Sequence, residues 1–181
     1  DGGYRSDPPA ADGQKVILSD TDHLWGLGCE QGWVWKTFTR GMNPLLMDPY
    51  QPFPGISEHP QWGAINSPDN PFWEPFRVEM GQTRRYADRM NLVEMVPSGD
   101  LASSGYCLAN VGQEYLVYLP DGGKVEVDLS DVNGQTDVEW FSPPEDQTQE
   151  AAPVPGGEKV VLESPFDGEA VVYLKAETGK A

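Results

Sequence analysis

The residues best suited to chemistry follow a short apolar run near the start of the 181-residue chain. Asp20, Asp22, His23 and Trp25 supply two carboxylates, an imidazole and an indole. Glycosidic bonds are cleaved between two carboxyl groups, about 5–5.5 Å apart in retaining and about 6.5–9.5 Å apart in inverting enzymes. Asp20 and Asp22 share a face if the strand continues through them, and a loop sets their separation if it has ended. Either geometry is open.

A β–α–β unit would position these side chains. The apolar run from Val16 predicts a strand buried on both faces, as in parallel sheets. Residues 32–41 predict a short helix, and residues 43–50 a second strand that ends in an acid. Carboxyl ends of parallel strands meet at one edge, where α/β folds carry their chemistry. The candidate catalytic residues are therefore Asp20, Asp22 and Asp48.

Other interpretations of these acids stay open. Asp20 and Asp22 can cap the turn by accepting hydrogen bonds from backbone N–H groups. Together with His23 and either Glu30 or Asp48 they could also ligate a metal ion. Their spacing matches no metal-binding motif, so we predict a site without a metal or cofactor.

Aromatic residues gather in the same half of the chain. Five of the six tryptophans lie within residues 25–73. Indole faces suit the C–H faces of a sugar, and Trp25 and Trp62 are the best placed because both fall on predicted loops. Trp33 and Trp35 would point to different sides of a helix. The predicted substrate-binding residues are His23, Trp25, Trp62, Arg40 and Tyr50.

A longer helix is predicted over residues 72–90, after Pro- and Asn-rich sequence. One face carries residues at helical spacing, and arginines occupy the other faces. We interpret the helix as packing on a core, with an arginine-lined ligand groove as the alternative. The residues of that face are Phe76, Met80, Thr83, Ala87 and Met90.

The pattern changes to period two after Pro97, which predicts strands. Turn sequences at 120–123 and 132–134 suit hairpins, so the second half predicts an antiparallel β-sandwich with Trp140 in its core. Residues 142–157 predict a long polar loop. The predicted strands are 106–111, 114–119, 124–129, 136–141, 159–163 and 170–174.

Charge and composition exclude several function classes. The net charge of −17 argues against binding to nucleic acid or to anionic membranes, which need clustered Lys and Arg. No apolar run approaches the roughly 20 residues of a membrane span. Cys29 and Cys107 do not make a disulfide framework, and we predict two free thiols, with a single bridge as the alternative.

Several motifs resemble known proteins. In the first half, similarity to the last part of apiosidase-like glycoside hydrolase barrels rests on Asp20-Thr-Asp-His-Leu-Trp-Gly26, Trp33-Val-Trp-Lys-Thr-Phe-Thr-Arg-Gly41 and Met47-Asp-Pro-Tyr50. In the second half, similarity to the β-sandwich that follows those barrels, named as the collagen-binding domain of a collagenase, rests on Tyr106-Cys-Leu-Ala-Asn, Glu114-Tyr-Leu-Val-Tyr-Leu-Pro and Val138-Glu-Trp-Phe.

The resemblance implies a fold and roles for residues. It implies a mainly β chain with some α structure: a partial β/α barrel segment over residues 1–91, made of a β–α–β unit and one long helix, and an antiparallel β-sandwich over 92–181. Asp20 falls where the family carries a nucleophilic carboxylate, commonly Glu, so its side chain is one methylene shorter. The family's acid/base carboxylate lies on an earlier strand, which these residues do not include. The resemblance also implies a secreted or periplasmic protein.

Three functions follow as hypotheses. The first is hydrolysis of a β-linked glycan or glycoside by strand-end carboxylates. The second is a non-catalytic module that binds carbohydrate or extracellular matrix, and the third is a sandwich that only braces a barrel. One β–α–β unit cannot close an eight-stranded barrel, so we expect either a homodimer or packing of residues 15–50 onto the sandwich.

Overall fold

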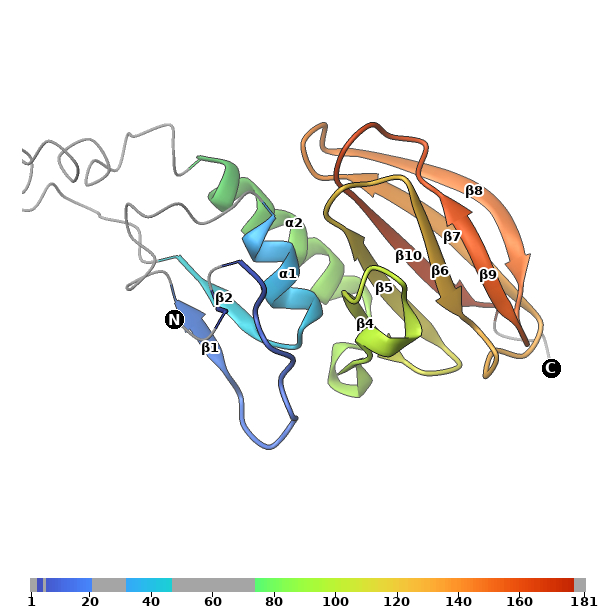
Figure 1. The fold of residues 1–181 in the computed structure, drawn as a ribbon, viewed down its shortest axis with the longest axis horizontal. Coiled ribbons are helices and arrows are strands. Elements are labelled where there is room, and N and C mark those ends of the chain that lie inside the picture. The colour runs from blue at the N-terminus through green and yellow to red at the C-terminus, as the bar shows by residue number, and fades with distance from the viewer. Residues whose placement is uncertain (1–2, 5, 21–31, 47–73, 178–181) are drawn as a thin grey trace, which may run out of the picture.

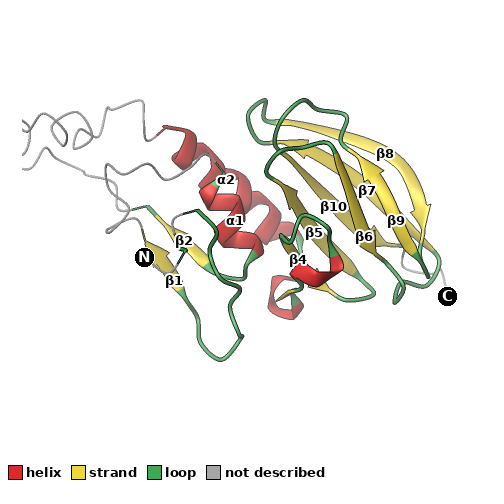
Figure 2. Ribbon diagram, in the orientation of Figure 1, coloured by secondary structure: helices red, strands yellow, loops and turns green. Residues whose placement is uncertain are grey.

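The computed structural model describes residues 3–4, 6–20, 32–46 and 74–177. Within these ranges the chain is mainly β, as predicted, with two α-helices between a small parallel sheet and a β-sandwich (Figures 1 and 2). None of the helices in these ranges has the length and apolar character needed to cross a membrane.

The first part of the chain forms the predicted β–α–β unit. Strand β1 (Leu18–Asp20) pairs in parallel with β2 (Asn43–Leu45), and helix α1 (Trp33–Thr39) connects them. The prediction that β1 is buried on both faces is wrong, because Leu18 is 64% exposed. A strand is covered on both faces only where other elements pack on both. In the described ranges α1 packs beside the pair, and only Ser19 of β1 is buried.

The long helix is confirmed as α2 (Glu74–Arg89). Phe76 and Thr83 on the predicted face are buried, and so is Met90 just beyond the helix end. The arginines on the other faces make ion pairs with carboxylates of the described residues. These pairs join Arg77 to Glu74, Arg84 to Asp88, Arg85 to Asp146 and Arg89 to Glu139.

The second half forms the predicted antiparallel sandwich. One sheet has six strands in the order β3-β4-β5-β10-β7-β8, and the other pairs β6 with β9. The core between them contains Trp140, as predicted, and the buried free thiol of Cys107. The bounds are β3 Val96–Pro97, β4 Cys107–Asn110, β5 Glu114–Leu119, β6 Lys124–Asp128, β7 Gln135–Ser142, β8 Gln147–Pro155, β9 Lys159–Glu163 and β10 Ala170–Ala176, with short 3₁₀ helices at Leu92–Glu94 and Gly99–Leu101.

One predicted loop is a strand. Most of residues 142–157 form β8, which pairs antiparallel with β7 at the edge of the large sheet. Both faces of β8 are wet, so its sequence lacks the alternation of apolar and polar residues by which strands are recognised. It also contains Pro153, which is tolerated on an edge strand because one side of the backbone needs no ladder partner.

An aromatic cluster joins the helices to the sandwich. Trp35 of α1 stacks on Tyr118 of β5, with ring centroids 6.2 Å apart, and its ring also meets Tyr86 and Phe141. Beside this cluster the Arg89 guanidinium donates two hydrogen bonds to the Glu139 carboxylate, at 2.7 and 2.8 Å. The helices and one face of the large sheet therefore share a hydrophobic cluster, apart from the core between the two sheets. The domain boundary at residues 91 and 92, and the homodimer, stay predictions.

Candidate functional site

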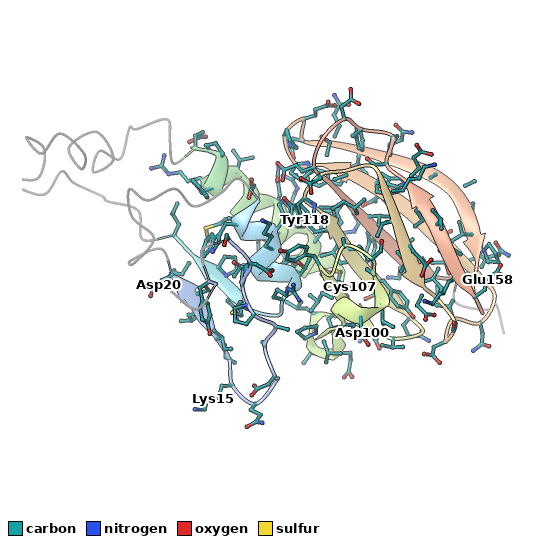
Figure 3. All side chains as sticks on the ribbon, in the orientation of Figure 1. Lys15, Asp20, Asp100, Cys107, Tyr118 and Glu158 are labelled. Carbon is teal, nitrogen blue, oxygen red and sulfur yellow. The ribbon has the colours of Figure 1, made fainter. Side chains whose placement is uncertain are left out.

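Asp20 is the last residue of β1, and its side chain is exposed. Because β1 and β2 are parallel, both end at the same edge of the sheet, where Asp20 lies opposite Leu45 (Figure 3). This placement agrees with the predicted strand-end position of the acid. The other predicted site residues of this half lie outside the described residues: Asp22, His23, Trp25, Asp48, Tyr50 and Trp62.

Arg40 and Asp20 lie at opposite edges of the parallel sheet. Arg40 caps the end of α1, just before β2 begins, so the topology puts it at the opposite edge of the parallel sheet. Its guanidinium donates to Asp7 Oδ1 at 3.2 Å and lies 4.6 Å from the ring centre of Tyr106. Arg40 thus ties α1 to the N-terminal segment and to the sandwich, and its role in substrate binding stays a prediction.

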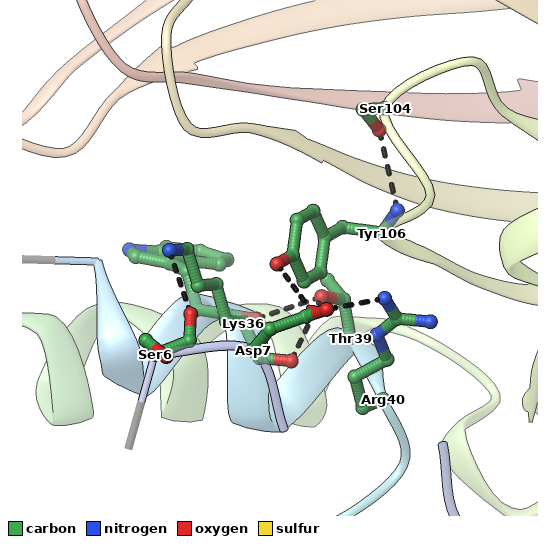
Figure 4. Close-up of polar contacts among 8 residues, drawn as sticks. Ser6, Asp7, Lys36, Thr39, Arg40, Ser104 and Tyr106 are labelled. Carbon is green, nitrogen blue, oxygen red and sulfur yellow. Dashed lines mark hydrogen bonds and ion pairs between the residues drawn. The ribbon is translucent and has the colours of Figure 1, made fainter. Parts of the chain in front are cut away.

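The same contacts stabilise the ionised form of Asp7. Tyr106 donates from its hydroxyl to Asp7 Oδ1 at 2.7 Å, and Lys36 donates to the nearby Ser6 carbonyl at 3.0 Å (Figure 4). The hydrogen bond from Tyr106, with the positive charge of Arg40, lowers the pKa of Asp7. The ionised Asp7 therefore links the N-terminal segment to α1 through Arg40 and to the sandwich through Tyr106. These contacts lie at the edge of the parallel sheet opposite Asp20.

A second pair of acids, which sequence reasoning missed, is buried between α2 and the sandwich. Glu79, in the second turn of α2, is 4% exposed, and Glu169, just before β10, is 8% exposed. The Tyr118 hydroxyl donates to Glu169 Oε2 at 2.5 Å. The backbone N–H of Gly32 donates to the Glu79 carboxylate. In Figure 3, Tyr118 marks this boundary, across the helices from Asp20.

Glu79 keeps its proton to an unusually high pH. Burial, and then the negative charge of Glu169, raise the pKa of Glu79 to about 8, although the Gly32 N–H opposes the shift. Burial and the charge of Glu169 also raise the pKa of Tyr118, so its hydroxyl stays a donor. At neutral pH Glu79 is therefore protonated.

Gly32 makes this arrangement possible. Its φ is +82°, a left-handed conformation that glycine adopts most easily. A Cβ at this position would lie 2.0 Å from the Tyr118 hydroxyl oxygen and 3.2 Å from Glu169 Oε2. The glycine therefore lets the start of α1 approach the Tyr118–Glu169 hydrogen bond.

We expect Gly32→Ala to lower the free energy of unfolding by about 2–4 kcal/mol, from backbone strain and from displacement of Tyr118. Urea denaturation would measure the loss. Gly157→Ala is the matched control, because Gly157 has a φ of +84° and nothing within 4 Å of the added Cβ. Equal losses in the two variants would mean that the contact with Tyr118 contributes nothing.

A sequence signal existed for one of the two acids. Glu79 lies three residues after Phe76 and four before Thr83, on the face predicted to be buried. A carboxylate on such a face is unusual enough to mark a site. Glu169 precedes a predicted strand by one residue, and no local pattern distinguishes it.

Comparison with known proteins bears on the sandwich by sequence and on most of the chain by fold. Residues 94–170 match the family model described as "Putative collagen-binding domain of a collagenase". This match confirms the prediction for the sandwich. No curated protein matches the chain.

Solved structures share the fold over most of the chain. One, named "Glycoside hydrolase", is 12% identical with a TM-score of 0.61, over 82% of this chain and 36% of its own. Another, a family 5 glycoside hydrolase from Bacteroides vulgatus, is 13% identical with a TM-score of 0.66, over 83% of this chain and 36% of its own. The chain thus has the fold of about a third of each of these proteins. The narrower apiosidase-like assignment stays a prediction.

Proposed function

We propose that the chain takes part in glycoside hydrolysis, as the last β/α portion of a barrel with its attached sandwich. The observation that carries this proposal is the parallel pairing of β1 and β2, with Asp20 at their shared carboxyl edge. Catalytic residues of β/α barrels lie at that edge. The fold shared with glycoside hydrolases supports the same class of reaction.

In this proposal the strand-end acids do the chemistry on a β-linked glycan or glycoside. Asp20 acts as nucleophile or base, and Asp22 or Asp48 supplies the second carboxyl group that the reaction needs. His23 and Trp25 position the sugar. Trp62, Tyr50 and Arg40 complete the predicted binding residues.

The sandwich would act as a brace for this edge. Trp35 and Phe38 of α1 lie in one cluster with sandwich residues such as Tyr118, so the helix that connects β1 to β2 is fixed against a rigid surface. Catalytic groups must be held within a fraction of an ångström of their productive geometry. Bracing the connecting helix would limit the motion of the strand ends.

We expect the chain to release reducing sugar from at least one β-glucan, xylan, pectin or aryl glycoside. Asp20→Asn should lower that rate at least about 100-fold, because the amide is a poor nucleophile and base at neutral pH. Asp12→Asn is the matched control: Asp12 is also exposed, but it precedes β1 at the opposite edge.

Hydrolysis that survives in Asp20→Asn would contradict the assigned role of Asp20. Glycan binding without turnover, lost in Trp25→Ala or Trp62→Ala, would instead favour the non-catalytic module. If the folded chain neither binds nor hydrolyses any of these compounds, its remaining role would be to brace a barrel.

A further inference from the structure

The buried acid pair lines a pocket that the proposed function does not use. The pocket holds about 400 Å³, within the range of small-ligand sites. Its described walls combine apolar side chains with three carboxyl groups from α2 and from the turn before β10. They are Glu74, Pro75, Val78, Glu79, Pro143, Pro144 and Glu169.

One carboxyl oxygen of this pocket has no hydrogen-bond partner among the residues that the structure describes. Glu79 Oε2 is fully buried, and no described residue donates to it. Buried polar atoms are almost always paired, and an unpaired carboxyl oxygen raises the free energy of the folded state. The pocket therefore presents an unpaired carboxyl oxygen of Glu79 beside the side chain of Glu169.

We infer that this pocket binds a primary ammonium group carried on an apolar stem, as in a lysine side chain or an amino sugar. An ammonium group brings N–H donors for Glu79 Oε2 and a positive charge for the two carboxyl groups. Pro75, Val78 and Pro144 give the stem an apolar surface to pack on. The net charge of −17 attracts cations to the chain as a whole.

A divalent metal ion fits this pocket less well. Calcium takes six to eight oxygen ligands, typically from several carboxylates and carbonyls. Within the described ranges no three His, Cys, Asp or Glu side chains converge on a common point that could hold a metal ion. A bare metal ion would also make no contact with the apolar walls.

Binding of the ammonium group is coupled to a proton. Glu79 faces Glu169 before β10, Tyr118 of β5 and, at the pocket wall, Glu74 of its own helix. Since Glu79 holds a proton below about pH 8, the ammonium group must displace that proton to form an ion pair. Affinity should therefore rise about tenfold per pH unit up to about pH 8 and then level off.

Isothermal titration calorimetry of the full chain tests the inference. The probes are Nα-acetyl-lysine methylamide and glucosamine, each beside its neutral counterpart, Nα-acetyl-norleucine methylamide or glucose. We expect the amines to bind and the neutral compounds to bind at least about tenfold more weakly. Titrations of the lysine derivative, whose amine stays protonated, in two buffers of different ionisation enthalpy should show about one proton released at pH 7 and almost none at pH 9.5.

Three variants locate the site. Glu79→Gln and Glu169→Gln should each weaken amine binding at least about tenfold, since each removes a charge from the ion pair. Glu163→Gln should leave it unchanged, because Glu163 is exposed on β9 and pairs with Lys124 in the other sheet. If Glu79→Gln does not fold, Glu169→Gln and the proton release of the wild type still test whether the amines bind in this pocket.

The inference would be overturned if amines and neutral compounds bound equally well, or if neither amine bound. Calcium binding that excludes the amines would overturn it too. Tighter binding of glucosamine would assign the pocket to a carbohydrate, and tighter binding of the lysine derivative to a protein side chain. These readings do not depend on hydrolysis, so the inference and the proposed function can fail separately.

Discussion

Replacing Trp35 by alanine should lower the free energy of unfolding by about 3–5 kcal/mol, the usual range for a large aromatic residue in a core. Trp35 is fully buried, and its indole stacks on Tyr118. It also meets Tyr86 of α2 and Phe141 of β7, so its removal would open a cavity where both helices join the sandwich. Neither helix could move to fill that cavity without breaking its remaining contacts in the same aromatic cluster.

Urea denaturation followed by circular dichroism would measure this loss. Trp35→Phe is the informative control, because it keeps an aromatic ring and removes an indole N–H with no acceptor among the described residues. We expect that variant to lose less than about 2 kcal/mol. A Trp35→Ala protein that keeps its stability, or that unfolds in two separate steps, would show that the helices and the sandwich do not share one cooperative core.

The sandwich could be predicted because its strands carry a local signal. In β6 the side chains of Val125 and Val127 are buried, and the polar residues between and around them face outward. This period-two alternation is present in the sequence before any folding is considered. Glycine-containing turns such as Pro120 to Gly123 then suggest which strands are neighbours.

Other features depend on contacts that the sequence does not display. β8 is an edge strand with two wet faces, so its assignment depends on its pairing with β7 and not on hydrophobicity. β1 carries an apolar run of the kind expected for a buried strand, yet Leu18 is exposed because burial depends on which elements cover the sheet. Local pattern predicts a strand more reliably than it predicts the surroundings of that strand.

The candidate site shows the same division. Asp20 could be predicted because a strand end and its acid are neighbours in sequence. Arg40 is also close in sequence to the predicted site, but the helix between the two strands carries it to the opposite edge. Glu79 and Glu169 come together only through the docking of α2 on the sandwich, and no local rule links residues so far apart.

That docking predicts the second large effect: above pH 8, Glu79→Gln should be about 3–5 kcal/mol more stable than the wild type. Glu79 has a pKa of about 8 in the folded chain, above its ordinary value of 4.5. Between these two values the folded state binds more protons than the unfolded state, so the wild type loses stability as the pH rises from about 4.5 to about 8. Below that window both states hold the proton, and the two proteins should be equally stable.

Glutamine removes this dependence without removing the side chain's shape. Its amide oxygen can still accept from the Gly32 N–H, and its uncharged head group has the size of the protonated acid. Chemical denaturation of both proteins at pH 5, 7 and 9 would give the difference, with the exposed Glu163→Gln expected to follow the wild type within about 0.5 kcal/mol. A constant difference between Glu79→Gln and the wild type across that range would mean that Glu79 is ionised throughout. The carboxylate would then need a cationic partner in the folded chain, and a protonated Glu79 could not describe the pocket.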